Sequence, residues 1–199
     1  MRSICVFGDN AAYGVFDHEK GGWAGRLREY LDNHDTDLVL YNLGVLMENT
    51  TDLLIRFEVE ATARVPKVII FQIGLHDSLY VDDEENHPVP LKAFGRNIER
   101  LIMAAQKITP KILFIGINSV DERKTMPTSW NKSIFFNNRN ATLYDSEIRK
   151  VATEKGVAHL PVSDSLKVRD LEDGLCLNSK GHAKIFKLAK KFLEEKKWL

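Results

Sequence analysis

The chain has 199 residues, of which 44% are hydrophobic and 28% charged, and its 28 basic residues balance 28 acidic ones. This composition is ordinary for a soluble globular protein, and the length suits one domain with a sizeable core. Because the formal net charge is zero, the chain lacks the electrostatic footprint of proteins that bind nucleic acid or acidic membrane surfaces, and we expect neither partner.

The sequence also carries no pattern typical of export or membrane insertion. It leads at once into an apolar strand, and no apolar run is long enough to span a bilayer. The two cysteines, Cys5 and Cys176, are far apart in the sequence, and a disulfide between them is not expected in a chain without an export signal. We therefore expect one domain over residues 1–199, located in the cytoplasm.

Apolar runs and helical periodicities alternate along the chain. Short apolar runs predict strands at residues 4–7, 37–41, 67–73, 111–117 and 157–162. Apolar residues at helical spacing predict amphipathic helices at residues 24–33, 50–64, 91–107, 140–155 and 181–197. Such alternation implies right-handed crossovers and a parallel sheet between two helix layers. The sequence therefore predicts an α/β fold, a three-layer α/β/α, flavodoxin-like domain with a parallel sheet of about five strands.

Two loops and one helix start carry further predictions. Residues 80–90 are acidic and contain two prolines, which predicts a surface loop. Residues 118–138 include Trp130, and a loop this long with its own aromatic residues usually serves function or covers a pocket. Trp130 is therefore a candidate pocket residue, although aromatic residues in such loops are as often plain anchors. The helix from residue 50 is expected to be capped by Thr50, Thr51 or Asp52.

Polar or small residues follow several of the predicted strands, where they would gather at one edge of a parallel sheet. Ligands bind at this edge in open α/β folds. The candidates are Asp9, Asn10, Gly44, Met47, His76, Asp77, Asp173 and Cys176. Of these, Asp9 and Asp77 look like catalytic carboxylates, but turn aspartates commonly bond the backbone of their own turn. We expect that role for both.

Four sequence blocks resemble the GDSL, or SGNH, hydrolase family in order and spacing. They are Phe7-Gly8-Asp9-Asn10, Tyr41-Asn42-Leu43-Gly44-Val45, Ile73-Gly74-Leu75-His76-Asp77-Ser78, and Asp173-Gly174-Leu175-Cys176-Leu177-Asn178 followed by Gly181-His182. The resemblance runs over nearly the whole chain. It implies the family's fold, a pocket of the kind that takes small esters, and no cofactor.

The resemblance also implies that the family's chemistry is altered here. In the family a serine attacks an ester, a histidine takes its proton, and an aspartate orients the histidine. A glycine amide and an asparagine side chain help the serine amide to hold the oxyanion. Residue by residue, the serine corresponds to Asn10, the glycine to Met47 and the asparagine to His76. The histidine corresponds to Cys176, and only Asp173 is retained.

These replacements differ in their expected effect. Met47 keeps a backbone N–H, and a neutral His76 can donate one hydrogen bond, so part of the oxyanion site could persist. The carboxamide of Asn10 is not a useful nucleophile, and losing one triad member typically costs about 10⁴-fold in rate. The resemblance thus implies a catalytically impaired or inactive homologue or variant. It would keep a pocket for an ester, acyl or sugar-like ligand, or bind a protein partner, without turnover.

Three alternatives remain at this stage. Cys176 and His76 could form a rebuilt cysteine–histidine site that hydrolyses small esters, opposed by the interpretation of an inert, partly buried thiol. His76, Cys176 and Asp173 are also ligand types suited to zinc, but close Cys-x-x-Cys spacing is absent, and we expect no metal. Finally, deliberate alteration of an active esterase would give the same pattern as a natural loss.

Overall fold

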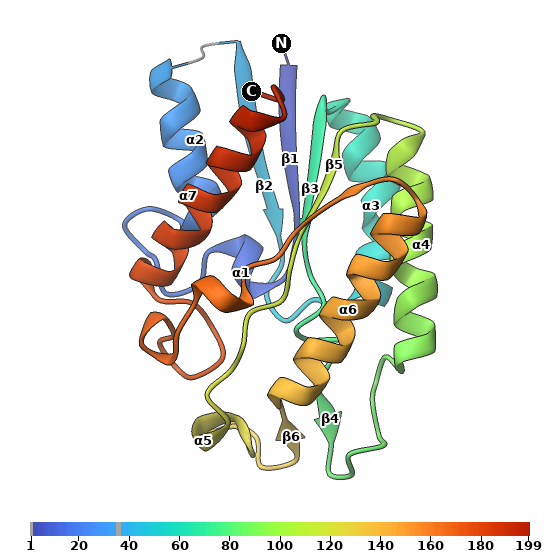
Figure 1. Cartoon of the computed structure of the whole chain (residues 1–199), viewed down its shortest axis with the longest axis vertical. Helices are drawn as coiled ribbons and strands as arrows, with labels where there is room; N and C mark the ends of the chain where they lie inside the picture. Colours follow the sequence, from blue (N-terminus) through green and yellow to red (C-terminus); the bar gives the residue numbers. More distant parts are fainter. Residues whose placement is uncertain (1, 35–36) are drawn as a thin grey trace.

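The computed structural model describes residues 2–34 and 37–199, and its centre is a parallel β-sheet. Five strands lie in the order β2-β1-β3-β5-β7, with helices on both faces (Figure 1). The strands are β1 (Arg2–Gly8), β2 (Leu38–Gly44), β3 (Val68–Gln72), β5 (Ile112–Ile115) and β7 (Ala158–Leu160). The predicted flavodoxin-like, three-layer α/β fold is therefore confirmed.

Helices form the two outer layers. Helices α2 and α7 pack together on one face of the sheet, and α3, α4 and α6 cover the other (Figure 1). The α-helices are α1 (Asn10–Tyr13), α2 (Gly22–His34), α3 (Thr50–Arg64), α4 (Leu91–Gln106), α5 (Glu122–Thr125), α6 (Asn138–Glu154) and α7 (Ser179–Glu195). Two 3₁₀ turns, η1 (Ser163–Ser165) and η2 (Val168–Asp170), precede α7. None of the helices in the described ranges is long and apolar enough to cross a membrane.

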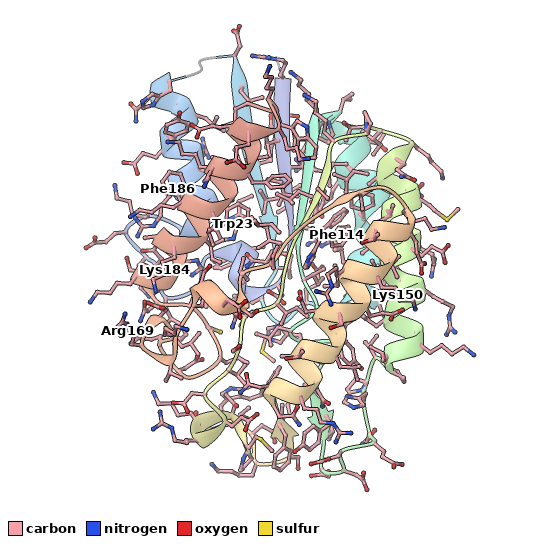
Figure 2. All side chains as sticks on the ribbon, viewed as in Figure 1. Trp23, Phe114, Lys150, Arg169, Lys184 and Phe186 are labelled. Atoms are coloured by element: carbon pink, nitrogen blue, oxygen red, sulfur yellow. The ribbon has the colours of Figure 1, made fainter. Side chains whose placement is uncertain are left out.

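The central strand β3 divides the apolar interior into two cores, because successive side chains of a strand point to opposite faces. Ile69 and Phe71 enter the core beneath α3 and α4, where the Phe71 ring stacks on Phe114 with centroids 4.7 Å apart. Ile70 enters the core beneath α2 and α7, which contains the fully buried Trp23. Figure 2 labels Trp23 of α2 and Phe114 of β5. Burial on both faces explains why residues 68–71 of this strand are all apolar.

A second, two-stranded sheet was not predicted from the sequence. Strand β4 (Tyr80–Val81) pairs antiparallel with β6 (Ile134–Phe135), and the rings of Tyr80 and Phe135 stack at 4.9 Å. This pairing joins the two segments that the sequence presents as separate loops. Strands of two residues are too short to show a hydrophobic period, so only the tertiary contact defines them.

The start of α3 corrects two predictions. Asn49, and not Thr50, Thr51 or Asp52, is the N-cap, since its side chain accepts hydrogen bonds from the N–H groups of Thr51 and Asp52. The Asp77 carboxylate does not bond its own turn. It accepts from the Thr50 N–H at 3.0 and 3.1 Å and from the Thr50 hydroxyl at 2.5 Å. The loop after β3 is thereby tied to the first turn of α3.

Removing a core side chain should destabilise the protein far more than removing an exposed one of the same type. Ile70 is fully buried, so Ile70→Ala should lower the free energy of unfolding by about 2–5 kcal/mol. Ile55 on α3 is 80% exposed, and Ile55→Ala should change it by less than about 0.5 kcal/mol. Urea denaturation of both variants measures the difference. Equal losses would contradict the described core.

Asp77 should make stability depend on pH. Burial raises the pKa of its carboxyl to about 7, although the hydrogen bonds from Thr50 oppose the shift. Between about pH 4 and 7 the folded protein then holds a proton that the unfolded chain has lost, so the free energy of unfolding should fall as the pH rises. Asp77→Asn should lack this part of the fall, whereas exposed Asp164→Asn should follow the wild type. Parallel pH profiles for Asp77→Asn and the wild type would refute the assignment.

Candidate functional site

The motif residues meet at the carboxyl edge of the sheet, as the sequence predicts. Asn10 begins α1 directly after β1, Met47 lies in the loop after β2, and His76 follows β3. Asp173 and Cys176 lie in the connection between η2 and α7. Hydrogen bonds join four of these residues into a row that runs from Met47 through Asn10 and Cys176 to Asp173.

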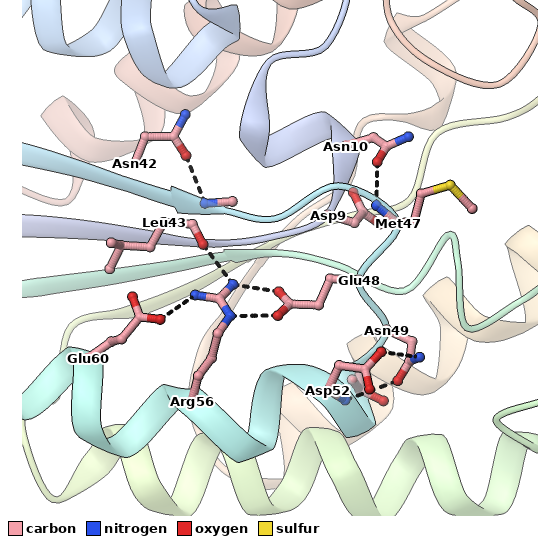
Figure 3. Close-up of polar contacts among 12 residues, drawn as sticks. Asp9, Asn10, Asn42, Leu43, Met47, Glu48, Asn49, Asp52, Arg56 and Glu60 are labelled. Atoms are coloured by element: carbon pink, nitrogen blue, oxygen red, sulfur yellow. Dashed lines mark hydrogen bonds and ion pairs between the residues drawn. The ribbon is translucent and has the colours of Figure 1, made fainter.

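The carboxamide of Asn10 lies at the centre of this row, and both of its ends are bonded. Its Oδ1 accepts from the backbone N–H of Met47 at 2.7 Å (Figure 3). Its Nδ2 donates to Sγ of Cys176 at 3.3 Å. Asn10 therefore links the loop after β2 to the turn before α7.

The loop that carries Met47 is held by an ion pair between buried Glu48 and partly buried Arg56. The guanidinium of Arg56 on α3 bonds both carboxylate oxygens of Glu48 at 2.6 Å (Figure 3). It also donates to the carbonyl of Leu43 at 2.7 Å and to Glu60 at 3.1 Å. Burial raises the pKa of Glu48, while Arg56 favours its charged form. These bonds fix the backbone next to Met47 and therefore the direction of its N–H.

Gly44 has a structural reason to be glycine. A Cβ added there would come within 2.3 Å of the Tyr13 nitrogen and 2.7 Å of its Cα. The end of β2 thus packs directly on the backbone of α1, and the Asn42 amide donates to the Tyr13 carbonyl at 3.2 Å. This close approach brings the loop after β2 beside Asn10.

Asp9 and His76 form a buried pair. Asp9 accepts from the N–H of Ala11 at 3.1 Å, which confirms the predicted bond within its own turn. Its other oxygen accepts from Nδ1 of His76 at 3.3 Å. The imidazole lies edge-on to Phe136, with centroids 5.8 Å apart. Its Nε2 is buried and has no hydrogen-bond partner among the described residues.

Cys176 and Asp173 belong to one turn. Oδ1 of Asp173 accepts from the N–H groups of Leu175 and Cys176 at 2.9 and 2.7 Å. The Cys176 side chain is nearly buried, and burial raises the pKa of its thiol to about 12, with the charges of Asp173 and Asp9 adding to the effect. The hydrogen bond from Asn10 only partly opposes it. The thiol environment thus favours the neutral form.

The two residues of the predicted cysteine–histidine site have separate partners. Cys176 bonds Asn10, whereas His76 bonds Asp9. Within residues 2–34 and 37–199, no three His, Cys, Asp or Glu side chains are arranged to hold a metal. The carboxylate of Asp77 faces α3, and Trp130 is half exposed on the loop before β6.

Glu48 and Arg56, which hold the loop that carries Met47, were not predicted from the sequence. A charged residue directly after Met47, followed by an arginine on a face of the next helix, is the signal that could have suggested the pair. Both side chains bond the protein itself, since Glu48 bonds Arg56, and Arg56 also bonds Glu60 and the Leu43 carbonyl. Their role is to position the Met47 amide.

Solved structures with this arrangement of elements include three hydrolases. The chain is similar to a lipase/acylhydrolase from Enterococcus faecalis, with TM-score 0.81 and 16% identity over 98% of this chain and 97% of that one. LAE5, an alpha/beta hydrolase from the metagenome of Lake Arreo, Spain, gives TM-score 0.74 and 16% identity over 97% and 94% of the two chains. Axe2, an acetylxylan esterase from Geobacillus stearothermophilus, gives 0.72 and 15% over 98% and 93%. At these identities the likeness shows the fold.

No curated protein sequence matches the chain. The profile of the GDSL-like lipase/acylhydrolase family, however, matches residues 6–184, which includes every block quoted above. The chain therefore belongs to the GDSL-like lipase/acylhydrolase family.

Proposed function

We propose that this protein is a family member that binds a small ester, acyl or sugar-like ligand without serine-dependent turnover. The observation that carries the proposal is the bonding of Asn10. The residue at the position of the family's nucleophile donates to Cys176 and accepts from Met47 at 2.7 Å. Cys176 and Met47 stand where the resemblance places the base and an oxyanion donor. The three positions are thus bonded to one another.

This bonding pattern opposes acyl transfer in two ways. An oxyanion site works because its donors are free and aimed at the charge that develops on the substrate. Here the Met47 N–H already donates to a carbonyl-type oxygen of the protein. In addition, a carboxamide is not activated by a general base, and Cys176 with a raised thiol pKa is not one.

The backbone at Met47 supports its match to the family's glycine. Its φ of 61° lies in the left-handed region, which glycine adopts without strain and other residues adopt at a cost of about 1–2 kcal/mol. The loop therefore keeps a glycine-type conformation with a methionine in it. We infer that the loop geometry of the family is retained although the residue has changed.

The class of ligand is inferred from relatives. The structural neighbours are named as a lipase/acylhydrolase and as an acetylxylan esterase. Both names describe enzymes that act on ester-linked acyl groups, and the second also names a carbohydrate. A cytoplasmic location remains the expectation from the sequence. The rebuilt Cys176–His76 hydrolase is the weaker alternative, because the two side chains bond Asn10 and Asp9 respectively.

The wild type should neither hydrolyse 4-nitrophenyl acetate above background nor be labelled by a fluorophosphonate probe. Asn10→Ser alone lacks a base, and Cys176→His alone lacks a nucleophile, so each should gain little. Because triad residues act as a unit, the double variant should gain much more than the sum. Adding His76→Asn should contribute roughly 3–4 kcal/mol of transition-state stabilisation through the side-chain donor that it recovers. Adding Met47→Gly should relieve the left-handed backbone at a position whose N–H donor is already present.

The kcat/KM values of the two single, the double and the quadruple variants measure these gains. Asp173→Asn in the quadruple variant is the control, since it should remove most of the restored activity. Stoichiometric labelling of a wild-type serine would overturn the proposal. Full activity of Asn10→Ser alone would show that a residue other than position 176 supplies the base.

Cys176 should be an unreactive thiol in the folded protein. With the pKa raised to about 12 by burial, very little thiolate exists at pH 8. Iodoacetamide should therefore alkylate Cys176 only after unfolding in urea, and His76→Ala should not change the rate. Mass spectrometry distinguishes Cys176 from buried Cys5. Rapid alkylation below pH 8 that slows in His76→Ala would instead favour the rebuilt hydrolase.

A further inference from the structure

An open groove lies beside the Asp173 turn, and its walls are rich in positive charge. It has a volume of about 710 Å³ including its mouth. Its lining residues are Arg123, Lys124, Pro127, Ser129, Lys132 and Asp173. Helix α5 and the segment that leads to β6 supply most of them, at the end of the molecule where the strands finish (Figure 1).

The groove is built by contact between two segments that are distant in sequence. The N–H of Asp121, at the start of α5, donates to the carbonyl of Gly174 at 2.8 Å. Gly174 has φ of 91°, and a Cβ there would lie 2.7 Å from Cβ of Lys124. Only glycine therefore lets α5 pack this closely on the Asp173 turn. The packing of α5 on this turn places Lys124 at the groove.

Two ammonium groups in the groove have no carboxylate partner in the part of the chain that the structure describes. Nζ of Lys124 and Nζ of Lys132 donate to the carbonyls of Glu172 and Thr128, each at 3.4 Å. Within the described ranges, neither lysine nitrogen lies within 4.0 Å of a carboxylate oxygen. Ammonium groups that line a groove without a direct ion pair are suited to an incoming anion.

Two further charged residues, Arg123 and Asp173, line the groove. The guanidinium of Arg123 is held by Asp121 through bonds of 2.8 and 2.9 Å, which neutralises its charge and fixes its orientation. That arginine also holds the pKa of Asp121 below its usual range. Asp173 is the one carboxylate that lines the groove, and its Oδ1 is already bonded to two N–H groups. Positive charge therefore dominates the lining.

We propose that this groove binds the anionic group of the protein's ligand, a carboxylate, sulfate or phosphate. The groove is linked to the Asn10 site through hydrogen bonds, because Asp173, which lines the groove, bonds the Cys176 N–H and Cys176 bonds Asn10. The exposed apolar residues Leu46 and Met47 belong to the loop whose Met47 N–H bonds the other end of the Asn10 carboxamide. A ligand across Asn10 thus has its charged end at the lysines. The position of the rest of the ligand across Asn10 rests on the proposed function, whereas the anion site does not.

The test is a titration of the ¹⁵N-labelled protein at pH 7 and constant ionic strength with glucuronate, sulfate and inorganic phosphate in separate series. At least one anion should give saturable shifts in the amides of residues 122–132 and 172–176. The preferred anion identifies the ligand chemistry. Lys124→Gln/Lys132→Gln should weaken this binding at least tenfold. Lys187→Gln/Lys191→Gln removes the same charge from exposed positions on α7 and should leave the affinity unchanged.

Shifts that do not saturate, or equal weakening in both double variants, would overturn the anion site. Dispersed amide spectra show that each variant is folded, so a loss of binding is not a loss of structure. The ester assay separates this inference from the previous one. If the wild type hydrolyses esters yet binds anions at the lysines, the proposed lack of turnover fails and the groove stands. If it is inert and binds none of the three anions, only the groove fails.

Discussion

The direction of one backbone N–H, that of Met47, sets what the carboxyl edge of this sheet can do. Its hydrogen bond to Asn10 is 2.7 Å long and connects the ends of β1 and β2. The bond depends on supports further back, since Arg56 holds Glu48 and the Leu43 carbonyl. This ion pair is thus the anchor of the loop. Removing Arg56 would leave the buried Glu48 carboxylate without its partner, a loss that typically costs about 3–5 kcal/mol.

The fold was predictable because its signals are local. Strands β1 and β3 are apolar runs, since helices cover both of their faces, and the amphipathic helices show their inward stripes directly. The small sheet of β4 and β6 was not predictable in this way. Its pairing depends on a contact between segments far apart in the chain, and neither segment contains a periodic pattern of its own.

At the site, too, contacts within one turn could be predicted from the sequence, whereas contacts between elements could not. The bond from Asp9 to the Ala11 N–H follows from a rule for turns and was predicted. Asp77 sits in a similar turn, yet it bonds Thr50 on another element. The sequence brings His76 and Cys176 to one edge of the sheet, but side-chain direction decides that they bond Asp9 and Asn10 respectively. Strand-end position therefore predicts which residues gather, and not which of them pair.

Binding at this site requires that ligand contacts offset the loss of internal ones. A ligand carbonyl that takes the Met47 N–H must displace Oδ1 of Asn10, at a net cost of about 1 kcal/mol for a hydrogen bond. Ion pairs at exposed side chains typically contribute about 0–1 kcal/mol each, and exposed Lys124 and Lys132 offer two such donors without carboxylate partners in the described chain. The lysines could thus offset the displacement of Asn10. The proposed binding without turnover and the proposed anion groove then fit one description, in which contacts remote from Asn10 supply the affinity.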